Sequence, residues 1–152
     1  MKQCYDWDKN ILEFEDVNEN RYCLEFKGNK TIVHGESATG KTLICTMLSN
    51  YIDDNNDIEL KPYDANNIII ASKDNKDKIN KQKKKLIIID RAEFLLDTEL
   101  IEIINRDRGT NRYLIFGRKP MGIELSPNHF AALCNKDGVI KLEYAYDEKG
   151  WY

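Results

Sequence analysis

The stretch Gly35-Glu-Ser-Ala-Thr-Gly-Lys-Thr42 decides which fold this chain is expected to adopt. It matches the pattern G-x-x-x-x-G-K-[ST] at every specified position. It follows a short apolar run, Thr31-Ile-Val-His34, and it leads into residues 41–51, whose apolar side chains recur at helical spacing. A strand, a glycine-containing loop and a helix in this order form the setting in which the pattern binds phosphate groups. The sequence therefore predicts a nucleoside phosphate site at this loop.

The residue types within the loop fit phosphate chemistry. Gly35 and Gly40 allow backbone conformations that other residues avoid, so the backbone can approach phosphates closely. Backbone N–H groups at the start of the next helix point inward, where the helix dipole also favours anions. Lys41 is expected to contact β- and γ-phosphate oxygens, and the Thr42 hydroxyl is expected to bind Mg²⁺. The predicted nucleotide-binding residues are Gly35, Glu36, Ser37, Ala38, Thr39, Gly40, Lys41 and Thr42.

A second motif is an aspartate directly after an apolar run, Leu86-Ile-Ile-Ile-Asp90. The continuous β-branched residues are typical of a parallel strand that is covered on both faces. Ligands bind at the carboxyl ends of such strands in open α/β sheets. Asp90 is therefore predicted to hold Mg²⁺ through water, beside Thr42. A role for Asp90 in capping the next helix is compatible with this one, because aspartate suits both.

Together the two motifs resemble the Walker A and Walker B motifs of P-loop NTPases. The resemblance covers roughly residues 30–118, and it is specific at the two motifs and generic elsewhere. Strand 112–116, which follows the acidic strand, looks like the additional strand of AAA- and ABC-type ATPases, between the loop strand and the acidic strand. The L-S-G-G-Q signature of ABC-type domains and the helical lid of AAA modules are missing from the sequence. The resemblance implies ATP and Mg²⁺ as ligands, and the lack of a guanine-reading N-K-x-D favours ATP over GTP.

The resemblance also implies catalytic residues. Hydrolytic members of the superfamily often carry a glutamate directly after the Walker B aspartate, but this chain has Arg91 there. Glu93 is the nearest glutamate, and two roles are open to it: it orients the attacking water, or it only caps or solvates its helix. Glu36 is a second candidate for the catalytic role. Arg118 stands where the family has a polar sensor residue, usually Asn, Ser or Thr, and is predicted to face the γ-phosphate. Lys41 completes the predicted catalytic set.

The expected fold class is α/β, a three-layer P-loop NTPase fold with a mostly parallel central sheet, helices on both faces and an N-terminal antiparallel hairpin. A single domain is expected over residues 1–152. Its parts are the hairpin in residues 1–29, the nucleotide-binding core in residues 30–118, and a C-terminal strand and tail in residues 119–152. Periodicity predicts strands at 11–17, 21–26, 67–71, 86–89, 112–116 and 139–146, and a helix at 93–105.

Composition excludes several classes of protein. The chain has 152 residues and a net charge of −3, so a basic surface over the whole molecule is excluded. No apolar run approaches the roughly 20 residues of a membrane helix. The four cysteines are scattered, without the spacing of a zinc site or a disulfide framework. We therefore expect no membrane insertion and a cytoplasmic location.

Two local groups of basic residues have more than one interpretation. The segment 73–85 holds seven lysines and two aspartates. It is either a basic loop that contacts nucleic-acid phosphates or a solvated connection, and the lack of aromatic residues favours the second. The second group consists of Arg106, Arg108 and Arg112. These residues either act across a subunit interface as an arginine finger or complement the C-terminus of a helix. The second role is the commoner one for arginines in such a place.

The function expected from these features is Mg²⁺-dependent ATP binding and hydrolysis by a minimal ATPase. Such a small ATPase is expected to self-associate or to serve a larger assembly, for example one that acts on DNA. Two other classes stay open. A nucleotide or small-molecule kinase would use Arg108, Arg112 and Arg118 for a second substrate, and a non-catalytic nucleotide-sensing module is indicated by Arg91. Oligomeric state, partner and biological process do not follow from the sequence.

Overall fold

The structure is a computed structural model, and it describes part of the chain. The described residues are 2–15, 21–33, 44, 48, 63, 64, 66–117, 122–124 and 129–144, with the backbone alone at 2, 3, 63 and 64. Over these ranges, no helix is both long enough and apolar enough to cross a membrane.

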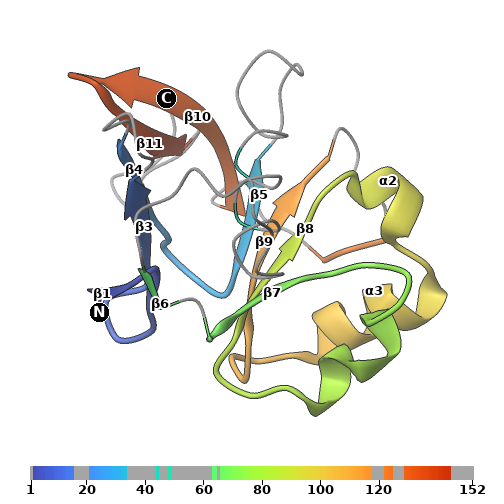
Figure 1. The fold of residues 1–152 in the computed structure, drawn as a ribbon. Coiled ribbons are helices and arrows are strands. Elements are labelled where there is room, and N and C mark those ends of the chain that lie inside the picture. The colour runs from blue at the N-terminus through green and yellow to red at the C-terminus, as the bar shows by residue number, and fades with distance from the viewer. Residues whose placement is uncertain are drawn as a thin grey trace.

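Four parallel strands form the part of the sheet that the apolar runs predict (Figure 1). They lie side by side in the order β5 (Lys30–Val33), β9 (Arg112–Phe116), β8 (Leu86–Ile89) and β7 (Ile68–Ile70). All four residues of β5 and of β8 are buried, which explains why both strands lack an alternating pattern. β9 lies between β5 and β8. The resemblance to AAA- and ABC-type ATPases implies this position for the strand that follows Asp90.

The predicted N-terminal hairpin is confirmed. It consists of β3 (Ile11–Glu15) and β4 (Arg21–Glu25), paired antiparallel with Leu12 opposite Leu24. The alternating sequence buries every second side chain, as expected of strands with one apolar face. A short strand, β2 (Tyr5–Asp6), extends the hairpin by antiparallel pairing with β3.

A second hairpin near the C-terminus was not expected. It pairs β10 (Phe130–Lys136) with β11 (Val139–Tyr144) through the two-residue turn Asp137-Gly138. Both turn residues have positive φ, 55° and 84°, as a type I′ turn requires. β10 pairs in parallel with β5, and β11 pairs in parallel with β4. The second hairpin therefore joins the N-terminal hairpin to the parallel strands.

The prediction of a three-layer α/β fold with a mostly parallel sheet is wrong. Nine strands form one mixed sheet in the order β2-β3-β4-β11-β10-β5-β9-β8-β7, with antiparallel hairpins inserted among parallel pairs. The sheet curls into a nearly closed, barrel-like shape, and few helices occur among the described residues (Figure 1). The physical reason is the β10–β11 hairpin, which makes the two halves of the sheet continuous. A separate two-stranded sheet pairs β1 (Lys2–Gln3) with β6 (Tyr63–Asp64).

Apolar side chains cover both faces of the parallel strands. On one face, α2 (Ala92–Leu95), α3 (Thr98–Arg106) and the 3₁₀ helix η2 (Lys76–Lys81) pack over the strands. On the other face, the hairpin strands curl over the sheet, and the helical residues Ile44 and Leu48 are completely buried with them. The apolar core on this other face includes Leu12, Phe14, Leu24, Val33, Ile88, Leu114 and Phe116.

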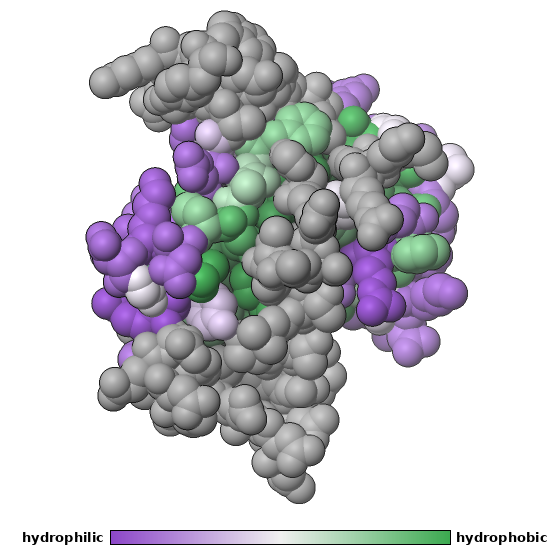
Figure 2. Space-filling model, turned by 90° about the horizontal axis from the view of Figure 1, so that it is seen from above, coloured by the Kyte–Doolittle hydropathy of each residue, from purple (hydrophilic) through white to green (hydrophobic). Residues whose placement is uncertain are grey.

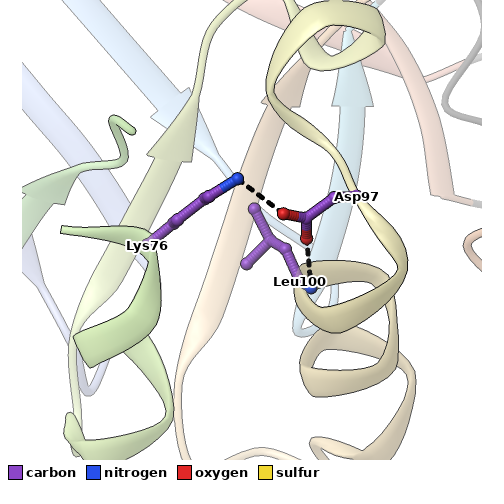
Figure 3. A network of polar contacts seen from close by, with 3 residues as sticks. All are labelled: Lys76, Asp97 and Leu100. Carbon is purple, nitrogen blue, oxygen red and sulfur yellow. Dashed lines mark hydrogen bonds and ion pairs between the residues drawn. The ribbon is translucent and has the colours of Figure 1, made fainter. Parts of the chain in front are cut away.

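The helix predicted at 93–105 is divided in two by Asp97. Its backbone is extended, with φ −125° and ψ 178°, so α2 ends before it and α3 begins after it. Its carboxylate accepts hydrogen bonds from the Leu100 N–H at 2.8 Å and from Lys76 Nζ at 2.5 Å (Figure 3). This cap satisfies a backbone donor of α3 and ties α3 to η2.

Replacing Asp97 by alanine is expected to lower the melting temperature near neutral pH. The hydrogen bond from Lys76, followed by that from Leu100, lowers the pKa of Asp97 below its ordinary value of 3.8. A lowered folded-state pKa contributes stability above pH 3.8, and this stability is lost as the pH falls through the folded-state value. Thermal unfolding should therefore show a difference between wild type and variant that shrinks below pH 3.8.

The matched control is Asp77→Ala, which removes an exposed aspartate from η2. It is expected to leave the melting temperature close to that of the wild type. A difference between wild type and Asp97→Ala that is as large at pH 2.5 as at pH 7 would contradict the assigned role of this carboxylate.

Candidate functional site at the carboxyl ends of β5, β8 and β9

Three parallel strands end at one edge of the sheet. Val33, the last residue of β5, pairs with Phe116 of β9, and Ile115 pairs with Ile89, the last residue of β8. The residues that follow these strands are therefore brought to a common edge. Asp90 follows β8 and Gly117 follows β9 at this edge. The predicted phosphate-binding loop starts two residues after β5 ends, so its chain leaves the sheet at the same place.

Glu93 reaches this edge from α2. A Cβ atom added to Gly117 would lie 2.9 Å from Glu93 Oε2 and 3.0 Å from the Ala92 Cβ. The Glu93 carboxylate therefore lies over the end of β9, in the space that a side chain at position 117 would take. The Gly117 N–H donates to the Val33 oxygen at 3.3 Å, which holds the end of β9 against the end of β5. Glu93 is thus close to the strand that leads into the loop.

The turn after Asp90 brings Glu93 to this position. Arg91 adopts the left-handed conformation, with φ 52° and ψ 56°, directly before the first residue of α2. This region is uncommon for a residue with a side chain, and it costs about 1 kcal/mol. Ala92 is completely buried, which fixes the start of the helix against the sheet. Arg91, at the position where the superfamily often has its glutamate, is itself exposed.

Asp90 is the described residue that the sequence predicts to hold a metal ion. It is partly exposed at the end of a completely buried strand. In the ranges that the structure describes, no group of three or more His, Cys, Asp or Glu side chains forms a ready metal site. Mg²⁺ does not need such a group, because it keeps several waters and takes one or two carboxylates together with substrate phosphates. A single partly exposed aspartate fits this mode of binding.

Several predicted site residues lie outside the described part of the chain. These are the loop Gly35–Thr42, which includes Lys41, and Arg118 directly after Gly117. Within the predicted helix 41–51, Ile44 and Leu48 are described and helical. Their spacing of four residues puts both on one helix face, and both belong to the core that includes Val33.

Three of the arginines considered for a finger or for a second substrate, Arg106, Arg108 and Arg112, do not reach this edge. Arg112 begins β9, at the opposite end of the strand from Gly117. Its guanidinium lies 3.9 Å above the centre of the Trp7 ring and donates to the Tyr5 hydroxyl at 2.8 Å. Arg112 therefore connects the parallel strands to the N-terminal segment.

Arg106 and Arg108 also lie at the amino end of β9. Arg106 Nε donates to the Glu102 carbonyl at 3.4 Å, and Arg108 Nη1 donates to the Asn105 carbonyl at 3.2 Å. Both contacts satisfy carbonyls in the last turns of α3, which is the commoner of the two roles that the sequence allows.

Burial shifts the pKa of two groups at the amino ends of β5 and β10. It lowers the pKa of Lys30, the first residue of β5, which is 6% exposed. It also lowers the pKa of His129, directly before β10, and the charge of Lys30 lowers it further. Because Phe130 of β10 lies opposite Ile32 of β5, His129 lies two positions before the level of Val33, and Lys30 lies three positions before it. They do not contribute to the edge described above.

Figure 2 looks down on the end of the molecule toward which β8 and β9 point in Figure 1. Apolar residues are visible in the middle of this face, and hydrophilic residues are visible on its sides. This end of the molecule therefore shows apolar residues between hydrophilic ones.

No protein-family model matches the chain, and no curated protein matches it either.

Proposed function

We propose that the protein binds ATP with Mg²⁺ and hydrolyses it, as a small P-loop ATPase. One observation carries the proposal. The strand that enters the pattern G-x-x-x-x-G-K-[ST] ends at the same edge of the sheet as the strand before Asp90, and Glu93 lies over the end of β9 between them. Phosphoryl transfer needs a phosphate cradle, a metal carboxylate and a group that orients the nucleophile at one place.

The roles divide among residues as follows. Residues 35–42 hold the phosphates, with Lys41 on the β- and γ-phosphate oxygens and Thr42 and Asp90 holding Mg²⁺. The ion would neutralise charge on the phosphate oxygens. Glu93 accepts a hydrogen bond from the attacking water and orients it. The order β5-β9-β8 supports the proposal, because it is the order that the resemblance to AAA- and ABC-type ATPases implies.

Replacing Lys41 by alanine is expected to abolish phosphate release from Mg²⁺–ATP and to weaken ATP binding at least tenfold, because one cation on the phosphates is removed. Phosphate release and ATP binding should be measured side by side, with and without EDTA. Chelation of Mg²⁺ is expected to stop turnover.

The matched control is Lys9→Ala, an exposed lysine in the N-terminal segment. It is expected to keep wild-type turnover. Tight binding of ATP without release of phosphate, together with transfer to an added acceptor, would identify a kinase instead. Binding without either reaction would identify a nucleotide sensor, and no binding would refute the proposal.

A further inference from the structure

Nine of the 23 lysine and arginine side chains lie in two short segments at one end of the molecule. The segments 73–85 and 105–111 together hold nine cationic side chains and three aspartates, a net charge of +6. Because the whole chain has a net charge of −3, the rest of the chain carries −9. Such an asymmetry creates a strong local field that attracts anions.

The two segments are held side by side by Asn111, which is 3% exposed. Its Nδ2 donates to the Gln82 carbonyl at 2.9 Å, and its Oδ1 accepts from the Lys85 N–H at 3.1 Å. The Lys84 N–H donates to the Thr110 carbonyl at 2.8 Å. Residues some 26 positions apart in the sequence are thereby fixed as one surface.

Six of the cationic residues of this surface are exposed, whereas the carboxylate of Asp107 is used internally. We call the surface the basic face, and it consists of the exposed residues Lys78, Lys81, Lys83, Lys84, Arg106 and Arg108. Asp107 accepts hydrogen bonds from three backbone N–H groups and from the Tyr113 hydroxyl. A hollow of about 310 Å³ lies between the segments, and it is lined by Asn80, Ile103, Arg106, Asp107, Thr110, Asn111 and Tyr113.

The basic face is separate from the candidate ATP site. Lys85 precedes β8 and Asp90 follows it, so the two surfaces lie at opposite ends of the strand, about 16 Å apart for five extended residues. Figure 1 shows the same separation, with η2 and the end of α3 at the lower end of the strands and α2 at the upper end.

The composition of the basic face indicates which kind of partner it fits. Protein interfaces depend on aromatic and apolar anchors, and Phe94 is the single exposed large hydrophobic residue among the described side chains. Phe94 lies on α2, at the other end of the strands. Lysine and arginine contacts without aromatic stacking are the means by which proteins hold the phosphate backbone of a duplex.

We propose that the basic face binds the phosphate backbone of duplex nucleic acid, without reading its sequence. The test is fluorescence anisotropy of a labelled 20-base-pair DNA of mixed sequence, at a series of salt concentrations. The wild type is expected to bind, with an affinity that falls steeply as salt rises. The triple variant Lys78→Glu, Lys81→Glu and Lys83→Glu is expected to bind at least tenfold more weakly. Its salt slope should be smaller by about 2 to 3, because up to three phosphate contacts are removed.

The matched control changes the net charge by the same amount elsewhere. It is Lys9→Glu, Lys136→Glu and Lys141→Glu, three exposed lysines on the N-terminal segment and the second hairpin. It is expected to bind within about twofold of the wild type. Equal weakening in both triple variants would show that net charge alone acts, and would overturn the proposal.

Three further arms separate the proposal from its alternatives. Lys41→Ala is expected to keep wild-type affinity for the duplex, so binding is tested independently of ATP. Poly-glutamate at an equal concentration of charge is expected not to displace the duplex; displacement would point to an acidic protein partner and overturn the proposal. Single-stranded DNA that binds tenfold more tightly than the duplex would also overturn it. Circular dichroism of each variant verifies that it is folded.

Discussion

Replacing Glu93 by glutamine is expected to lower the turnover of Mg²⁺–ATP by about 100-fold or more while ATP binding is retained. The amide has the same shape as the carboxylate but does not accept a proton or carry the charge that orients water. The carboxylate lies over the end of β9, with Oε2 2.9 Å from the place of a Cβ at Gly117. The measurement is kcat for phosphate release together with the Kd for ATP. Glu99→Gln, an exposed glutamate on α3, is the control and should keep wild-type turnover.

Gly117→Ala tests the same geometry without changing the carboxylate. The added methyl group would meet Glu93 Oε2 and the Ala92 Cβ, so the carboxylate has to move away from the end of β9. We expect a lower kcat with little change in the Kd for ATP. Gly28→Ala is the matched control, because a Cβ at position 28 meets nothing within 4 Å. Wild-type turnover in both Glu93→Gln and Gly117→Ala would exclude Glu93 as the base, even if Lys41→Ala is inactive.

Phe14→Ala is expected to lower the free energy of unfolding by about 3–5 kcal/mol. Phe14 lies on β3 in the N-terminal hairpin, and its side chain is completely buried. It stacks on Tyr22, with ring centres 4.6 Å apart, and it shares a core with Leu114 and Phe116 of β9. The hairpin is therefore expected to unfold together with the parallel strands. Urea denaturation followed by circular dichroism measures the loss.

Phe94→Ala is the control for this prediction. The Phe94 side chain is 76% exposed, so its removal leaves no buried cavity. It is expected to change the free energy of unfolding by less than about 0.5 kcal/mol. A similarly small change for Phe14→Ala would show that the hairpin does not contribute to the stability of the common core, in contrast to the single domain that the sequence predicts.

The strands that local sequence predicts were found close to their predicted bounds. Residues 86–89 and 112–116 are strands, because β-branched and aromatic residues in short apolar runs suit a buried sheet. The N-terminal hairpin was predicted from the alternation of apolar and polar residues in its two strands. The helix cap at Asp97, in contrast, was not predicted. Apolar residues continue at helical spacing on both sides of Asp97, so one helix was predicted where there are two.

The second hairpin was missed although a local signal for it exists. Asp137-Gly138 is a preferred pair for a two-residue type I′ turn, and Val139–Tyr144 after it was predicted as a strand. The preceding strand, Phe130–Lys136, has no alternating pattern, which hid the pairing. The consequence was large, since this hairpin connects β4 to β5 and changes the sheet from mostly parallel to mixed.

The sequence by itself determined the phosphate-loop pattern, the aspartate at the end of β8 and most of the strands, because these depend on residue type and short spacing. The tertiary structure alone decided which strands are neighbours, and thereby brought Glu93 to Gly117 and Val33. It also decided that Arg112 belongs to the far end of β9, against Trp7. Strand order depends on pairing between residues far apart in the chain, and local periodicity carries no information about it.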